Sequence, residues 1–548
     1  MKDLTQTPAP LRDPNRIMRL SQMGAAFPTR LSFLRILLRR LMDEKPQLRE
    51  TIWDMDDAGF GYGVFTIALG GQDYSLVAIT QPLAPEDRTD RVIAEKWDAA
   101  FVLFDGIPGP EDIARIRKNA PLQEAGRFGP KDLCLSRANK SVRLFDAIIN
   151  AQQTGTAFPE DEIRKVGYLM RTTAVYGNGK FGLADRDDYA GRPAMMAPFQ
   201  AEMLTVWLIR HFTHRLIEHL AGAALPVQLR RTLGIGNSTG LGMAPFLVSH
   251  PLLLHSWVAC RETAFARVLD ADVTPEVAVD LHANASQIAT HLEEWNVPDP
   301  KAQTSIESTR QHWHDVVAGL SPRDFQQPGT LRRIWETARD LSPEVEELAL
   351  AWMTESFPEL VDGLTDCLAN PFRPQLDVTM PSAELRAGID AHWPAIQDLD
   401  FDCKDTCAQF WYVSEAKQEP RLGQRATDPG AELESPLDVA RRMSRLRADL
   451  AGCEDALWQF LLRHPEHRDA ARRMQALMAN VFSEIRDNLL DVETAPIDML
   501  RFKLAMFGAT KFDPKSSLWT RITLFSGGPL ADEIADGTAQ DHTWMPVF

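Results

Sequence analysis

Two glycine-bearing polar stretches near the middle of the chain contain the residue types best suited to chemistry. Residues 171–188 read RTTAVYGNGKFGLADRDD, and residues 231–246 read RTLGIGNSTGLGMAPF. Glycine lets a backbone approach a ligand closely, and exposed backbone amides attract anions. The sequence therefore predicts a small-molecule site in these two stretches.

The first stretch combines positive charge with groups that can move a proton. Arginine binds carboxylates and phosphates in a fixed bidentate geometry, and a buried lysine can act as a base. The alternative is a structural turn with solvated charges. From this stretch we expect catalytic roles for Tyr176, Lys180 and Asp185, and substrate binding by Arg171, Asn178, Gly179 and Arg186.

The glycines of this stretch also spell G-x-G-x-x-G, at Gly177, Gly179 and Gly182. That pattern binds dinucleotides only between a strand and a helix of a parallel β-α-β unit. Because no alternation of strands and helices surrounds it, we do not expect a dinucleotide fold here.

The second stretch places hydroxyl and amide groups before an apolar helix. A helix N-terminus with free amides binds anions, so Asn237, Ser238 and Thr239 are predicted substrate ligands. No lysine follows the last glycine, which excludes a P-loop. His250, in the apolar segment, is a candidate acid or base. Alternatively, the glycines serve a helix cap and a close helix crossing, and the histidine is a buried structural residue.

Two further clusters contain residues that can bind an anion or a metal ion. Lys511 lies in a basic polar patch that either folds back onto the central site or simply ends the C-terminal helices. His211, His214 and Glu218 share one helical face, as in bundles that bind two metal ions. No second copy of that pattern exists, so we expect no metal site there.

The elements that must position these groups are predicted to be mainly α-helical. Residues 61–69 and 74–80 flank a GGQD turn and predict a hairpin, and residues 97–106 predict another strand. From about residue 111 the periodicity is helical. The expected fold is a multi-helical, bundle-like body with a small N-terminal α+β subdomain.

The predicted organisation has five parts. They are a basic N-terminal helical segment (1–50), the α+β subdomain (51–110), the main helical domain with the glycine-rich loops (111–416), a loop or linker (417–438), and a C-terminal helix pair with a basic polar tail that packs on the main domain (439–548).

Composition limits the class of protein. The chain has 548 residues and a net charge of −17, which disfavours nucleic-acid binding. Its six cysteines are too few for a disulfide scaffold and predict reduced thiols in a cytoplasmic protein. Neither a signal peptide nor a transmembrane segment is expected. The basic amphipathic helix at 29–41 is predicted to dock on the body of the protein rather than on a membrane or partner.

Together these patterns favour a cytoplasmic, homo-oligomeric enzyme that acts on a small anionic metabolite. Acid–base chemistry without a cofactor, by a lyase, isomerase or hydrolase, is the simplest class. One alternative is an enzyme that holds a nucleotide or flavin cofactor in the glycine loops. Another is a helical interaction or scaffold protein without catalysis. Arginines buried beside the glycine loops would favour the enzyme.

Overall fold

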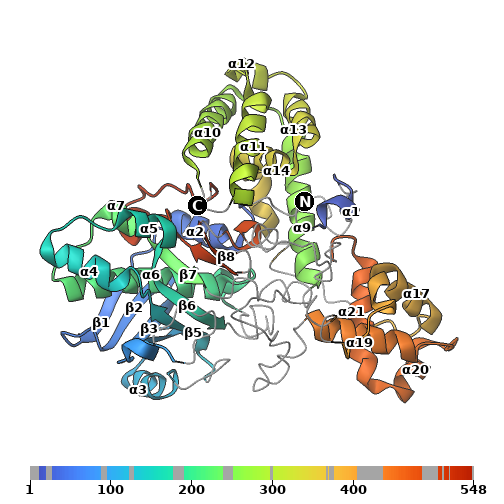
Figure 1. Ribbon diagram of the computed structural model, residues 1–548, viewed down its shortest axis with the longest axis horizontal. Coiled ribbons are helices and arrows are strands. Elements are labelled where there is room, and N and C mark those ends of the chain that lie inside the picture. The colour runs from blue at the N-terminus through green and yellow to red at the C-terminus, as the bar shows by residue number, and fades with distance from the viewer. Residues whose placement is uncertain are drawn as a thin grey trace.

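A nine-stranded sheet forms the centre of the computed structural model (Figure 1). The structure describes residues 11–19, 22, 27–87, 96–121, 129–176, 191–237, 251–296, 300–365, 368, 376–403, 406, 436–483, 504–508, 511–516 and 519–545. The strands lie in the order β1-β2-β3-β4-β5-β6-β7-β9-β8. Their bounds are β1 (Arg49–Met55), β2 (Gly61–Leu69), β3 (Gln72–Thr80), β4 (Ala99–Asp105), β5 (Asp132–Lys140), β6 (Tyr168–Tyr176), β7 (Gly234–Asn237), β8 (Lys511–Ser516) and β9 (Trp519–Leu524).

This sheet overturns the predicted helical body with a small hairpin subdomain. The hairpin of β2 and β3 and the strand β4 are where the sequence predicts them. The sheet then continues through β5, β6 and β7, and it ends with two strands from the C-terminal tail. Segments that the sequence assigned to a helical domain and to a polar tail are therefore strands of one sheet, which contains both parallel and antiparallel pairs.

One long helix, α6 (Gln200–Ala221), lies across one face of the sheet. It contacts β2 through β7, and its apolar residues share one core with Phe101, Met170 and Ile235 of the strands. The other face is covered over β2 to β5 by α3 (Pro110–Asn119), whose Ile113 and Ile116 pack on Val77 and Val102. Strands β3 to β5 are thus buried on both faces, which removes the polar–apolar alternation of a half-exposed strand.

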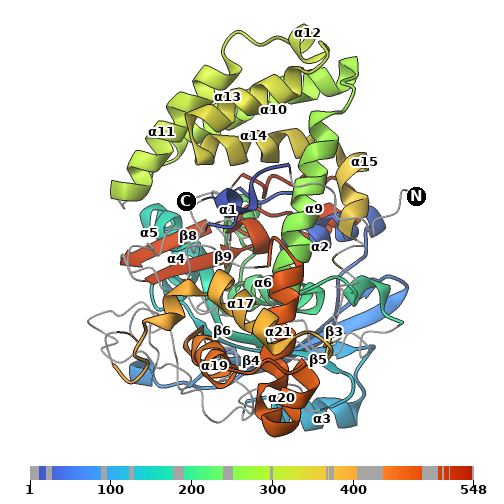
Figure 2. The ribbon, with the colours of Figure 1, turned by 90° about the vertical axis from the view of Figure 1, so that its right-hand side faces the viewer.

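The helices outside the sheet layer form two groups (Figures 1 and 2). Helix α9 leads into a layer of α10 to α14, and a second group of helices surrounds a small core of its own. The first group comprises α9 (Pro251–Leu269), α10 (Pro275–Glu294), α11 (Pro300–Val317), α12 (Pro322–Phe325), α13 (Thr330–Leu341) and α14 (Pro343–Glu355). The second comprises α17 (Ser382–His392), α19 (Pro436–Asp449), α20 (Leu457–Arg463) and α21 (Arg468–Ala479).

The remaining helices are short or lie near the chain ends. They are α1 (Pro14–Ile17), α2 (Phe33–Glu44), α4 (Phe145–Thr154), α5 (Glu160–Val166), α7 (Val227–Thr232), α15 (Pro358–Val361) and α23 (Ala531–Ala535), with 3-10 turns η1 (Pro85–Asp87), η4 (Pro193–Met195), η6 (Asp362–Leu364), η7 (Pro394–Gln397) and η9 (Pro465–His467). Helix α2 buries Leu34, Leu38 and Leu41 completely. The basic N-terminal helix therefore docks on the body, as the sequence predicts.

Local caps explain several helix starts. Thr274 and Ser342 accept hydrogen bonds from the backbone N–H groups of Val277 and Val345, and each precedes a proline in the first turn. Such caps satisfy amide groups that have no partner within the helix. The apolar residues along 439–460 are divided between α19 and α20, and Met443, Leu446 and Phe460 among them share one core.

A buried ion network anchors the N-terminal segment to the helical layer. Arg12, only 6% exposed, bonds Glu262 of α9 at 2.6 Å and Glu347 of α14 at 2.5 Å. Arg261 also pairs with Glu347. Burial opposes ionisation of Glu347, but the two arginines outweigh it and hold the pKa of this carboxyl below its usual value. Paired in this way, the charges remain buried without an isolated ion.

The fully buried side chain of Arg210 on α6 binds the backbone of two segments that are distant in the sequence. Its guanidinium donates to the carbonyl oxygens of Arg230, Arg231 and Leu233 just before β7. It also donates to those of Gly528 and Pro529 after β9. Burial lowers its pKa to about 9, so the side chain stays charged at neutral pH.

We expect Arg210→Met to reduce the free energy of unfolding by at least about 3 kcal/mol, because it leaves several buried carbonyls without a donor. Urea unfolding followed by circular dichroism measures this. The matched control is Arg164→Met on α5, where the side chain is 71% exposed and pairs weakly with Asp161. The control should change stability by less than about 0.5 kcal/mol. Equal losses in both variants would refute the role of Arg210.

Candidate functional site

Strands β6 and β7 lie side by side and parallel, and each leads directly into one of the two glycine-bearing stretches. Among the described strand pairs this is the single parallel one. Arg171 pairs with Gly236, and Thr172 pairs with Asn237. Because the strands run in the same direction, the chain leaves both at the same edge of the sheet. Ligands of α/β sheets bind at such carboxyl ends.

The face of the sheet that points away from α6 becomes basic at this edge. Arg171 and Arg137 of β5 are each only 2% exposed. Asn139 pairs directly with Arg171, and Arg137 lies two residues before Asn139. Paired residues and residues two apart share a face of a sheet. The two guanidinium groups therefore lie on one face of neighbouring strands.

The same row continues into the C-terminal strands. Gly236 pairs with Thr523 of β9, and Thr523 pairs with Lys511 of β8. Thr523 is completely buried. On the opposite face the neighbours Ile235, Ile522 and Leu524 belong to the core under α6. The polar row is therefore distinct from the apolar packing of the same strands.

The change of character across this face is sharp. Over β3 and β4 it holds Val77, Val102 and Phe104 under α3, and Leu135 of β5 is the last of these apolar residues. Two residues later along β5, Arg137 stacks on the ring of Trp97 at 4.3 Å. One half of the face is thus built as a core and the other half as a charged surface removed from water. Charges in such a place interact more strongly than in bulk solvent.

The buried carboxylate of Asp98, next to this row, is hydrogen-bonded to the backbone of β5. Asp98, fully buried, accepts a hydrogen bond from the backbone N–H of Lys140 at 3.2 Å. Its own backbone N–H donates to Oδ1 of Asn139 at 3.0 Å. These bonds fix the end of β5 beside Arg171. Asn139 is therefore a positioning residue of the row rather than an open polar group.

The predicted site residues have different outcomes. The structure brings the backbones of Arg171, Asn237 and Lys511 onto β6, β7 and β8 of one sheet, with β9 between β7 and β8. Tyr176 is the last residue of β6 and pairs with Leu135. Their roles in binding and catalysis stay predictions. The other predicted residues, Asn178, Gly179, Lys180, Asp185, Arg186, Ser238, Thr239 and His250, lie outside the described residues.

Sequence reasoning missed Arg137, Asn139 and Thr523 because it assigned their segments to helices and to a polar tail. The signal that was present is the mixture in β5, DLCLSRANK, where every residue is buried and three of the last four are polar or charged. A strand that is buried throughout yet carries arginine and lysine is a candidate site, because buried charges need partners.

Two glycines of the second stretch have a structural explanation. A Cβ on Gly236 would lie 2.7 Å from the ring of Tyr168, and one on Gly234 would lie 2.3 Å from the carbonyl oxygen of Leu524. Both residues are buried in β7. Close packing, rather than approach to a ligand, therefore accounts for glycine at these two positions.

Gly236→Ala should reduce the free energy of unfolding by about 1–3 kcal/mol, because the buried ring of Tyr168 must move to admit the methyl group. Thermal or urea unfolding measures the loss. Gly363→Ala is the matched control, since a Cβ there meets nothing within 4 Å. The control should stay within about 0.5 kcal/mol. A Gly236→Ala protein as stable as the parent would show that this contact is loose.

Two histidines of α6, His211 and His214, are neutral at neutral pH. Burial, with a further contribution from Arg210, holds the pKa values of His211 and His214 well below 6.5. Glu218 accepts a hydrogen bond from the backbone N–H of Leu225 at 2.9 Å. The one group of described residues with metal-binding geometry lies elsewhere, around Asp449. His255 of α9 stacks on Phe482, and burial lowers its pKa to about 4.

These lowered pKa values predict acid sensitivity. In the unfolded chain a histidine takes up a proton near pH 6.5, whereas folded His214, 4% exposed, does so only at lower pH. The contribution of neutral His214 to the free energy of unfolding is therefore fully present above pH 6.5. It is lost as the pH falls below 6.5. His214→Gln should shrink the stability difference between pH 7 and pH 5 by up to about 2 kcal/mol. Urea unfolding at both values measures this, and exposed His314→Gln should leave the difference unchanged.

Comparisons with known proteins add no family to this geometry. Protein-family models, curated proteins and solved structures each gave no match to the chain. Among the described helices, none combines the length and the unbroken apolar sequence that a membrane span requires. The four described cysteines, Cys134, Cys260, Cys403 and Cys453, carry free thiols. The function of the protein is therefore inferred from the geometry of the site.

Proposed function

We propose that this chain is an enzyme that binds a small anionic metabolite, a carboxylate or a phosphate, at the carboxyl ends of β6 and β7. The observation that carries the proposal is buried Arg171 on β6, in register with Gly236 of the parallel strand β7. Arg137 on the neighbouring strand adds a second buried guanidinium to the same face. Arginine recognises planar anions with two parallel hydrogen bonds, which suits both ligand classes.

The burial of the two arginines supports binding of an anion rather than a solvated charge. Arginine is rarely buried, and a guanidinium removed from water attracts an anion more strongly than a solvated one does. The row of Arg137, Asn139, Arg171 and Thr523 also lies where two sequence-predicted polar segments begin. A structural turn with solvated charges does not account for buried charge at this edge.

The proposed chemistry is acid–base catalysis. In this proposal the arginines hold the anion, and Tyr176, Lys180, Asp185 and His250 are the candidates for proton transfer. Asn237 pairs with Thr172 and Ile522 on the opposite face of the sheet, so the register does not place it beside the two arginines. A carboxylate held beside such groups suits proton abstraction, elimination or hydrolysis. These correspond to isomerases, lyases and hydrolases, and each class gains from a bound anion placed in a water-poor site.

A second candidate is an enzyme with a nucleotide-containing cofactor. One observation favours it: G-x-G-x-x-G at residues 177–182 directly follows β6, and the chain returns through α6 to the parallel strand β7. The sequence was expected to lack such a crossover. Against it, α6 begins only at Gln200, so its N-terminus does not follow the glycines as it does in dinucleotide folds. The absorption spectrum and intact mass of the purified protein distinguish the two candidates.

The interaction-protein alternative loses its proposed docking element. Helix α2, the basic amphipathic helix, buries its apolar face in the core of this chain. Its Arg35 is 1% exposed and bonds Asp541 at 2.9 Å. The helix is therefore committed within the chain, and the enzyme reading takes precedence.

Binding of anions tests the proposal. Native mass spectrometry against a panel of small carboxylates and phosphates should identify a ligand, which calorimetry then quantifies. Arg171→Lys keeps the charge but loses the bidentate geometry, and it should weaken binding at least about tenfold, as a lost charge-assisted hydrogen bond implies. Arg137→Gln should do the same.

An exposed arginine provides the control for the binding test. Arg164→Gln removes an exposed arginine and should leave binding unchanged. Lys180→Ala and Ser238→Ala, in the two polar stretches, should lower activity without changing the melting temperature. A ligand bound equally well by the parent, Arg171→Lys and Arg137→Gln would contradict the proposed site.

A further inference from the structure

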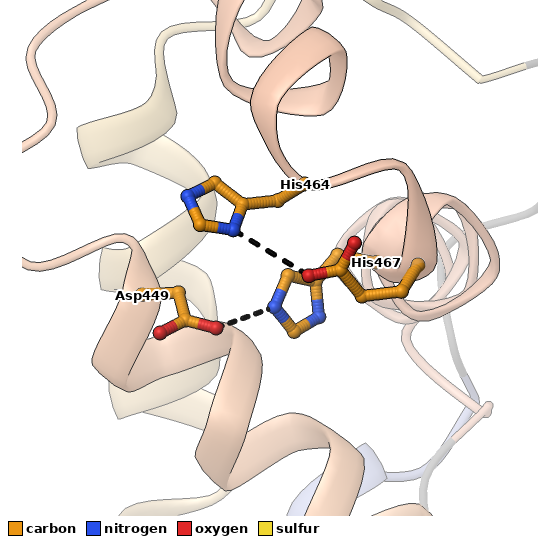
Figure 3. A group of neighbouring side chains, drawn as sticks. Asp449, His464 and His467 are labelled. Atoms are coloured by element: carbon orange, nitrogen blue, oxygen red, sulfur yellow. Dashed lines mark hydrogen bonds and ion pairs between the residues drawn. The ribbon is translucent and has the colours of Figure 1, made fainter.

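Four potential metal ligands converge in the small C-terminal group of helices, away from the sheet. They are Asp449 at the end of α19, His464 after α20, and Glu466 and His467 in η9. One donor atom from each lies within 4.8 Å of all the others. Figure 3 shows both imidazole rings and Asp449 turned toward one another.

We propose that these four side chains form a binding site for a divalent transition-metal ion, with Zn²⁺ as the best fit. Zinc prefers four ligands in a tetrahedron, drawn from imidazole nitrogens and carboxylate oxygens. Bonds of the usual length place neighbouring ligand atoms about 3.4 Å apart in a tetrahedron. The observed separations are at most 4.8 Å, and two of them are 2.7 Å and 3.5 Å.

The rings are held in place before any ion binds. Phe460 stacks on His464 with ring centroids 4.8 Å apart and on His467 with centroids 5.7 Å apart. Pro465 occupies the turn between the two histidines and restricts its backbone. A site whose ligands are already fixed loses less entropy on binding.

Access and charge also suit a cation. His467 is 7% exposed and forms the base of the site, whereas the Asp449 and Glu466 side chains are 45% and 60% exposed. The two carboxylates supply negative charge at the mouth. The neighbouring Arg463 and Arg472 pair with Asp455 and Asp469 respectively. An ion can therefore enter from solvent and retain water on its open side.

A simple ion pair explains only half of this arrangement. Nε2 of His467 lies 2.7 Å from Oδ2 of Asp449, which is one hydrogen bond. Nδ1 of His464 and Oε1 of Glu466, 3.5 Å apart, form a second pair, and the donor atoms of both pairs lie within 4.8 Å of one another. A metal ion replaces the shared proton and binds all four groups. It would then connect the end of α19 to the start of α21, across the core of Met443, Phe460 and Met474.

The test uses the full-length chain without an affinity tag, stripped with a chelator and titrated with ZnCl₂. We expect one Zn²⁺ ion per chain by calorimetry and native mass spectrometry, and a higher melting temperature with the ion. Co²⁺ in its place should give the visible absorption bands of a tetrahedral site. His464→Gln and Asp449→Asn should each weaken Zn²⁺ binding at least tenfold.

His314→Gln is the control, because this histidine is 47% exposed beside Glu293 and lies outside the cluster. It should bind Zn²⁺ like the parent. If His467→Gln fails to fold, the exposed variants Asp449→Asn and Glu466→Gln decide the question. Absence of Zn²⁺ binding by the folded parent overturns the proposal. Binding that persists unchanged in His464→Gln and Asp449→Asn also overturns it.

Discussion

One buried cation, Arg210, determines where the proposed site can form. Its five hydrogen bonds fix the backbone before β7 and after β9 to the same point on α6. Strand β7 has only four residues, so the bonds of Arg210 to the backbone before it add to a short ladder. The parallel alignment of Arg171 with Gly236 is therefore supported by a charge that lies on the opposite side of the sheet from the proposed site.

The same arrangement makes the proposed site depend on pairing between distant parts of the chain. Strand β9, which pairs with β7, comes from the C-terminal tail, nearly 300 residues further along the chain. Contacts of such sequence separation carry a large loop-closure entropy, and folds rich in them form slowly. The ion pair of Arg35 with Asp541 holds the last segment against α2, close to the start of the chain. Both ends of the chain thus secure the strands that carry the polar row.

The sequence predicted the elements that are specified locally. The hairpin of β2 and β3 has a glycine turn between apolar runs, and α10 and α14 begin with a capping residue and a proline. The later strands lack such signals. All nine residues of β5 are buried, so they do not alternate, and β7 reads only GIGN. Their pairing partners are distant in sequence, and no local pattern encodes that pairing.

Glycine content, one reason for predicting a site at residues 231–246, has a different explanation in the structure. Glycine drew attention to residues 231–246, yet Gly234 and Gly236 are required by Leu524 and by the ring of Tyr168. What supports a site at this edge is instead the buried arginine pair, of which the sequence analysis named one member, Arg171. Packing explains why a side chain is absent at Gly236, but it does not explain why two guanidinium groups are buried beside it. Burying a cation opposes folding unless anionic or carbonyl groups compensate it, and Arg210 shows how this chain does so with carbonyls alone. Arg137 stacks on Trp97, and both Arg137 and Arg171 lie on the face of the sheet near the strand ends, where the proposed anion would add negative charge to their surroundings.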